Sequence, residues 1–380
     1  MNKFKYYFIL SITTLSLFSC SKDDATAEIT PPRDFAVQYA TDLTDIEEYL
    51  KTYSITVVNH PGFADDQDVT FKKIATGGTE PSIYSYLNSA TFPKLLSKEV
   101  KLHDISYKLY YLVLREGVGQ QPTNVDGVLT AYRGEYLSRT KVADVETLGT
   151  TFFEESKNPQ QFFNLPSTIV GWGESFPKFK GGTYSSNSNG TVSYRDFGAG
   201  VFFIPSGLGY FSQGKDGIPA YAPLIFSIKL YEINRVDSDG DGILNFQEDL
   251  NNDGYIYNYS NKVNYPTFPA DNIRYADDSD KDGIPNALDT DDDGDGYSTK
   301  IETKYVNPLD PQKVVHYYPF NGAAVDDDAT RFVDESQGIP RRFTGVANPP
   351  STLPTPVKSD FTDANRLRRH LDETTYPPYE

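Results

Sequence analysis

The sequence predicts an α+β fold that is rich in strands and is divided into at least two domains. It holds 28 Tyr and 24 Phe against one Met and one Trp, a balance typical of sheets rather than of helical bundles. One stretch with helical spacing precedes a series of short alternating apolar runs, and after Ile233 the composition changes abruptly to Asp, Asn and Gly. At 380 residues the chain is long enough for two domains of about 100–200 residues each.

Charge and cysteine content exclude several classes of function. A net charge of −18 without a basic stripe repels a phosphate backbone, so we expect no nucleic-acid partner and consider cations the better candidates. Cys20 is the only cysteine, which excludes an intramolecular disulfide and a cysteine-based zinc site. None of the four histidines accompanies a nucleophile motif, which argues against a conventional hydrolase.

The first twenty residues predict a lipoprotein signal peptide. Lys3 and Lys5 precede an apolar run that ends in Ser19-Cys20, too short and too polar for a membrane-spanning helix. The ending resembles a lipobox, which implies cleavage before Cys20, acylation of Cys20 and attachment to a membrane. A plain cleaved signal is the alternative.

Residues 21–32 are a short polar tether that ends in Pro31-Pro32. Its beginning, residues 21–24, resembles the export signal of Bacteroidetes lipoproteins. We therefore expect an outer-membrane lipoprotein, exposed on the cell surface or, if those residues are only an acidic tether, facing the periplasm.

Residues 33–103 form an N-terminal region of one helix and lead-in strands. Apolar residues in 33–53 recur at helical spacing after the two prolines, which predicts one amphipathic helix packed on the following domain. Short β-like runs follow at 54–59, 68–74 and 100–114, separated by Gly and Pro.

Residues 104–233 carry an ordered series of aromatic and glycine motifs. Tyr132-Arg133-Gly134 ends a strand, and a second strand contains Phe152-Phe153. Ile169-Val170-Gly171-Trp172 would open a short helix. Ile204-Pro205 then leads to Leu208-Gly209-Tyr210, and Ile218-Pro219 precedes the alternating strand 224–230.

In order and spacing this series resembles the FKBP-type peptidyl-prolyl cis-trans isomerases. The resemblance implies a curved antiparallel sheet wrapped on a short helix, and a non-covalent reaction on proline-containing exported polypeptides. By this resemblance, Trp172 would form the floor of the pocket, and the Tyr210 hydroxyl and the Ile169 N–H would hold the carbonyls of the peptide. The implied pocket residues are Tyr132, Phe152 or Phe153, Phe163, Ile169, Trp172, Tyr210, Ile218 and Phe226.

The chain departs from the family pattern in three places. The family usually has Phe-Asp where this chain has Phe152-Phe153, or Phe153-Glu154 if one residue is inserted, so the aspartate is missing. The Gly/Ser/Asn-rich stretch between residues 179 and 201 is lengthened, and the approach to Ile218 lacks the usual aromatic or His. The missing aspartate favours an alternative function, a non-catalytic binding module for Pro-containing segments.

Residues 234–312 predict acidic calcium-binding loops, because Asp recurs at alternate positions with Gly at the sixth of twelve. Alternate acids can direct several hard oxygens to one ion, and the glycine permits the sharp turn. The loops begin at Asp237, Asp249, Asp278 and Asp291. The predicted ligands are Asp237, Asp239, Asp241, Ile243 and Glu248 in the first loop, Asp249, Asn251 and Asp253 in the second, Asp278, Asp280, Asp282 and Asp289 in the third, and Asp291, Asp293, Asp295 and Glu302 in the fourth.

These loops differ from helix-loop-helix calcium sensors, because a strand pattern precedes the first and Pro285 would interrupt a helix leaving the third. They resemble the thrombospondin type 3 repeats of bacterial surface proteins. The resemblance implies a region made rigid by about two to four structural Ca²⁺ ions. A solvated acidic linker is the alternative. Residues 313–380 form a Pro-rich tail whose Arg cluster has no motif of its own.

Overall fold

The computed structural model describes residues 31–142, 144–306, 311–321, 338–347 and 351–377. Contacts divide the chain into a short unit ending at Arg33 and a second unit from Asp34 to Glu380. The predicted signal peptide with Cys20, and the tether up to residue 30, lie outside the described residues. No helix in the described ranges is both long and apolar enough to cross a membrane.

The predicted amphipathic helix is present as α2, Phe35–Thr52. The Asp34 side chain caps it by accepting a hydrogen bond of 3.0 Å from the Val37 N–H, which satisfies one of the free donors of the first turn. Its apolar side, with Ile46, Tyr49 and Leu50, is fully buried. The helix therefore packs against the sheet, as its spacing predicts.

One seven-stranded sheet forms the main part of the fold, and every pairing in it is antiparallel. The strand order is β3-β4-β10-β11-β5-β6, with the short β7 paired to β5. The bounds are β3 Lys94–Leu102, β4 Ile105–Arg115, β5 Gly127–Val142, β6 Val145–Ser156, β7 Phe163–Asn164, β10 Gly198–Ile204 and β11 Leu224–Asn234.

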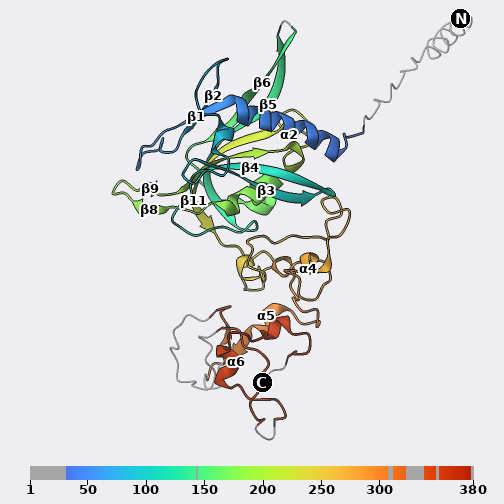
Figure 1. The fold of residues 1–380 in the computed structure, drawn as a ribbon. Helices are drawn as coiled ribbons and strands as arrows, with labels where there is room; N and C mark the ends of the chain where they lie inside the picture. The colour runs from blue at the N-terminus through green and yellow to red at the C-terminus, as the bar shows by residue number, and fades with distance from the viewer. Residues whose placement is uncertain (1–30, 143, 307–310, 322–337, 348–350, 378–380) are drawn as a thin grey trace, which may run out of the picture. The chain divides into compact units, whose positions relative to one another are not determined.

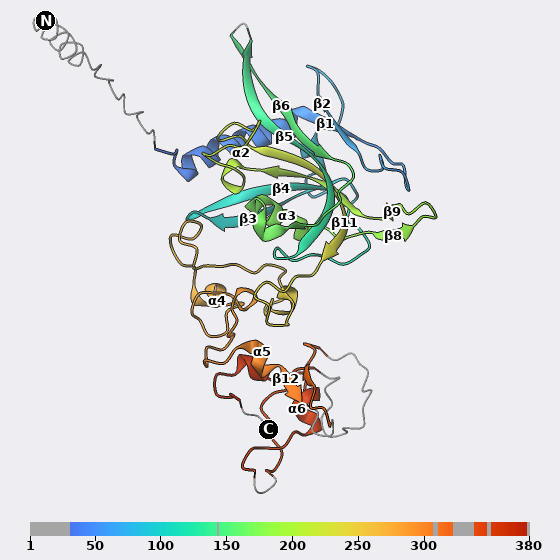
Figure 2. The ribbon, with the colours of Figure 1, turned by 180° about the vertical axis from the view of Figure 1, so that it is seen from behind.

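Both faces of this sheet are covered. The strand β10 is buried along its whole length, with Phe202 and Ile204 in one core and Val201 and Phe203 in the other. The first core contains the short helix α3, Val170–Ser175, and the second contains α2. Figure 1 shows α2 running across the curved sheet, and Figure 2 shows α3 on its other side. The sheet is thus the middle layer between two helices.

The strand predicted at 100–114 is in fact a hairpin. Leu102 pairs with Ile105, and the two residues between them, His103 and Asp104, both have positive φ (53° and 58°), as a tight turn of this kind requires. His-Asp is not a usual turn signal, which explains why the sequence reads as one run. The sheet accordingly begins at Lys94, earlier than the expected domain start at residue 104.

The remaining elements are short and lie outside the main sheet. The lengthened stretch after α3 contains a hairpin of its own, β8 and β9. These elements are β1 Tyr53–Val57, β2 Val69–Lys73, η1 Ile83–Tyr86, η2 Leu165–Ser167, η3 Phe176–Lys178, β8 Thr183–Ser186, β9 Val192–Arg195, η4 Ser206–Leu208, η5 Asn245–Gln247, α4 Asp271–Arg274, η6 Asn286–Leu288, α5 Thr299–Glu302, β12 Lys304–Val306, β13 Val315–Tyr317, α6 Lys358–Thr362 and η8 Arg369–Leu371.

The tail contributes to a small apolar core beside the acidic loops. Ile243, from the first loop, is grouped with the buried side chains of Tyr318, Ile339, Phe343 and Phe361. Arg369, 1% exposed, donates to the backbone oxygens of Glu302 and Lys304. One arginine of the tail cluster therefore contacts the end of the fourth loop.

Candidate functional site

The motifs of residues 104–233 bring a group of aromatic rings together around Trp172. Trp172 lies on α3 and contacts Tyr132 of β5, Phe163 of β7 and Phe226 of β11 edge to face, at ring-centroid distances of 5.3, 5.5 and 5.2 Å. Edge-to-face contacts of this length are favourable because the positive edge of one ring meets the negative face of the next. Four segments far apart in the chain thus form one aromatic site.

Trp172 is held in place by close packing from behind. The indole is 5% exposed and also contacts Phe176 at 5.3 Å. A side chain at the preceding Gly171 would overlap Ile204, so only glycine lets the helix approach the sheet this closely. The indole Nε1–H is buried and has no hydrogen-bond partner among the described residues.

A β-bulge decides which of the two neighbouring phenylalanines joins this site. The register of β5 and β6 shifts between Gly134 and Glu135, so that Phe153 is an extra residue with no partner across the ladder. Its ring lies against Gly134, where a Cβ would overlap it, and meets Phe226 at 5.7 Å. Phe152 instead is 49% exposed and covers the Arg133 guanidinium at 4.5 Å.

The bulge also brings in a carboxylate that sequence reasoning did not select. Glu154 lies beside the Tyr132 hydroxyl, and burial together with this neighbouring charge raises the pKa of Tyr132 above its usual range. Burial, and more weakly Glu154, raise the pKa of Tyr210 as well. The structure therefore brings Phe153 and Glu154, and not Phe152, to the aromatic site. The sequence offered two pairs at this point, Phe152-Phe153 or, with one inserted residue, Phe153-Glu154. Only the strand pairing shows which pair lies at the aromatic site.

Polar donors remain available at the edge of the aromatic site. Ile169 is the N-cap of α3 and accepts a 2.9 Å hydrogen bond from the Trp172 N–H, whereas its own N–H donates to no residue in the described chain. Tyr210 is half-buried against the same core as Trp172, and Ile218 is 6% exposed in it. The site thus combines a buried apolar floor with a few hydrogen-bond donors. Such an arrangement can assist rotation about a bond, which requires no nucleophile.

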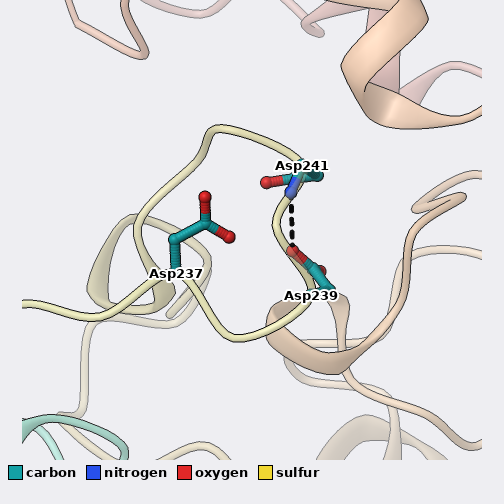
Figure 3. Close-up of side chains that lie close together, drawn as sticks. All are labelled: Asp237, Asp239 and Asp241. Atoms are coloured by element: carbon teal, nitrogen blue, oxygen red, sulfur yellow. Dashed lines mark hydrogen bonds between the residues drawn. The ribbon is translucent and has the colours of Figure 1, made fainter.

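The four acidic loops share one backbone conformation. Their sixth-position glycines, Gly242, Gly254, Gly283 and Gly296, all have φ between 85° and 105°. In each loop this glycine N–H donates to the first-position Asp at 2.8–3.1 Å, and the fifth-position N–H donates to the third side chain at 2.8–3.2 Å. Figure 3 shows the first loop, in which Asp237, Asp239 and Asp241 lie around a common space.

Three of the loops gather carboxylates closely enough to share an ion. One oxygen from each of the first, third and fifth residues lies within 4.8 Å of the others in the loops that begin at Asp237, Asp278 and Asp291. The second loop, with Asp249, Asn251 and Asp253, has the same turn but supplies an amide in place of one acid. The predicted twelfth-position ligands Asp289 and Glu302 are not members of these groups, although Glu302 is buried.

Electrostatics indicates that these groups fit a cation. Burial, followed by repulsion from its neighbours, raises the pKa of Asp293 to about 7, and the same causes raise the pKa of Asp239 and Asp241. A divalent ion would favour the charged carboxylates and reverse these shifts. The donor set is entirely oxygen, which suits Ca²⁺ better than a softer metal.

Comparison with known proteins relates part of the chain to isomerases. Over 127 residues, 33% of the chain, it is 32% identical to the probable FKBP-type peptidyl-prolyl cis-trans isomerase FkpA of Neisseria meningitidis and covers 38% of that protein. Over 135 residues it is 29% identical to FkpA of Aeromonas hydrophila, covering 41% of it. About a third of the chain is therefore homologous, at low identity, to FKBP-type isomerases, and the chain spans less than half of either relative.

Two solved structures and one family model complete the comparison. A peptidyl-prolyl isomerase of Pseudomonas syringae is 17% identical with a TM-score of 0.28, covering 54% of this chain and 100% of that one. FkpA of Escherichia coli is 26% identical with a TM-score of 0.24, covering 33% and 48%. Residues 238–332, which include the acidic loops except for Asp237, match a family described as BamM C-terminal.

Proposed function

We propose that this protein is a peptidyl-prolyl cis-trans isomerase that acts on exported polypeptides at the cell envelope. The observation that carries the proposal is the group of aromatic rings around Trp172, which the chain assembles from four separate segments. Homology to FKBP-type isomerases over about a third of the chain supports it at the level of the family.

The reaction needs an apolar surface rather than a nucleophile. Rotation about an X-Pro bond crosses a barrier of about 18–20 kcal/mol, because the twisted amide loses its resonance. The twisted amide is less polar than the planar one, so a dry aromatic surface that holds the prolyl ring favours the transition state over the ground state. Trp172, Tyr132, Phe153 and Phe226 supply that surface.

Hydrogen-bond donors orient the peptide. Neither the Ile169 N–H nor the Tyr210 hydroxyl donates a hydrogen bond to another residue of the described fold. Both can therefore hold the carbonyls that flank the proline. We take Glu154, which lies beside Tyr132, as the counterpart of the family's aspartate. The longer side chain is the feature that favours the alternative, a module that binds Pro-containing segments without catalysis.

Phe153→Ala is expected to slow catalysis of X-Pro isomerisation by about tenfold, equivalent to about 1.4 kcal/mol of transition-state stabilisation. The reason is that the Phe153 ring forms part of the apolar surface, whereas its neighbour Phe152 points away over Arg133. The rate of cis-to-trans conversion of an X-Pro peptide is measured with the chain lacking residues 1–20. Phe152→Ala is the matched control and retains the wild-type rate.

Two results would change the assignment. Equal rates for the Phe153 and Phe152 variants and the wild type would remove Phe153 from the site. A wild-type chain that accelerates nothing, while Trp172 fluorescence still responds to the Pro-containing peptide, would replace the enzyme by the binding module.

The acidic loops are proposed to hold structural calcium. Their common turn and their clustered carboxylates support this function, since without a cation the charges repel one another. Calorimetric titration of the chelator-treated chain is expected to count about two to four bound Ca²⁺ ions, with a rise in the melting temperature. Binding of none would reject calcium as the partner of these loops.

The proposed location is the outer membrane, through a lipid on Cys20. The signal-like run of residues 1–20 and the acids that follow Cys20 support export, to the cell surface or to the periplasmic face. Labelled palmitate should enter the wild-type protein in the cell and be absent from Cys20→Ala. Equal labelling of both chains would reject the lipoprotein assignment.

A further inference from the structure

Asp292 is a buried acid that the loop pattern does not explain. It is the second residue of the fourth acidic loop, a position held by Ser238 in the first loop and Ser279 in the third. In all three loops the backbone N–H at this position donates to the ninth residue, at 2.9–3.2 Å. The turn therefore forms with serine, and the carboxylate at residue 292 serves some other purpose.

The carboxylate of Asp292 points away from its own loop and toward the first one. One of its oxygens lies within 4.8 Å of carboxylate oxygens of Asp241 and Glu248. A further contact joins the same two loops, since Lys300 Nζ donates to the Gly240 carbonyl at 2.7 Å. The first and fourth loops are thus neighbours at this point.

Two of these side chains are buried without partners. Asp292 is 1% exposed and Glu248 is 2% exposed, and neither oxygen of either carboxylate accepts a hydrogen bond from the described residues. Lys300, the cation that lies near, is bound to a carbonyl and forms no ion pair with them in the described structure. Buried carboxylates are strongly unfavourable unless they are paired or coordinate a metal.

We infer that Asp292 completes a divalent-cation site of the first loop, with Asp237, Asp239, Asp241 and Glu248 as the other ligands. The inference rests on the proposal that the loops hold calcium. Two groups of three carboxylates share Asp241, one with Asp237 and Asp239 and the other with Glu248 and Asp292, and neither contains a nitrogen or sulfur ligand. Together they offer the hard oxygens and the high ligand number that Ca²⁺ requires. One ion then joins two loops that lie about fifty residues apart in the chain.

The test is a calorimetric Ca²⁺ titration of the chain lacking residues 1–20 and of three single variants. Asp292→Ser introduces the residue that the sister loops use, and Asp292→Asn keeps the shape of the side chain. Both are expected to weaken one binding step by about tenfold or more and to leave the other steps unchanged. Asp271→Asn, which removes an exposed acid between the second and third loops, binds calcium like the wild type.

A double variant identifies the ion concerned. If Asp292 and Glu248 hold the same ion, Glu248→Gln removes one calcium-binding step. Adding Asp292→Asn to that variant then removes no further step, so the two effects do not add. Loss of two separate steps, or unchanged binding in both Asp292 variants, would overturn the shared site and leave calcium binding by the loops standing. A wild-type chain that binds no calcium would reject the underlying proposal instead.

Discussion

Replacing Trp172 with alanine is expected to abolish measurable isomerase activity and to lower the free energy of unfolding by about 3–5 kcal/mol. The indole is 5% exposed and contacts four aromatic rings, so its removal leaves a cavity in the centre of the first core. The same ring is the proposed floor for the prolyl side chain. Urea denaturation measures the first effect, and the X-Pro peptide assay measures the second.

Trp172→Phe separates the two effects. Phenylalanine fills much of the space and keeps the edge-to-face contacts, so this variant loses less stability and remains folded under assay conditions. Its rate should still fall clearly, because the smaller ring covers less of the prolyl side chain. A folded Trp172→Ala chain with the wild-type rate would contradict the proposed site.

Replacing Lys98 with methionine is expected to destabilise the fold by about 3–5 kcal/mol, because a buried charge loses its counter-ion. Lys98 Nζ lies 2.5 Å from the carboxylate of Glu174, which is 3% exposed. Burial lowers the pKa of Lys98 to about 8, so the lysine is still mostly charged at neutral pH. Thermal or urea unfolding of the chain lacking residues 1–20 measures the loss.

The double variant Lys98→Met, Glu174→Gln is the control for this second effect. With both charges removed, most of the stability should return, since an ion pair replaced as a whole by neutral groups is often close to neutral in energy. Glu174 lies on α3 two residues after Trp172, so the single variant should also reduce isomerase activity. An unchanged unfolding transition in Lys98→Met would show that water reaches the pair.

Local patterns in the sequence predicted the parts of this fold that depend on neighbours along the chain. The helix α2 followed from apolar spacing after two prolines, and the four loop turns followed from the glycine at the sixth position of each loop. The grouping of Tyr132, Phe163, Trp172 and Phe226 was implied by the resemblance to FKBP-type isomerases, and the structure brings these four rings together.

Features that depend on pairing between distant segments were not predictable in this way. The bulge that selects Phe153 over Phe152 exists only in the ladder between β5 and β6. The turn at His103-Asp104 has no common signal, so two strands read as one. The approach of Asp292 to Glu248 joins two separate loops, and nothing in either loop alone indicates it.

The second acidic loop also leads directly into a contact with α3. Tyr255 and Tyr257 donate hydrogen bonds to the backbone and carboxylate oxygens of Glu174, at 3.1 and 3.2 Å. Asn124 and Ile256 exchange two further hydrogen bonds, of 2.9 and 2.8 Å. Recombination that cut the gene near residue 233 would therefore yield a fragment with its Lys98-Glu174 pair uncovered. The isomerase-like part and the first acidic loops are thus expected to be inherited and exchanged together, as one module.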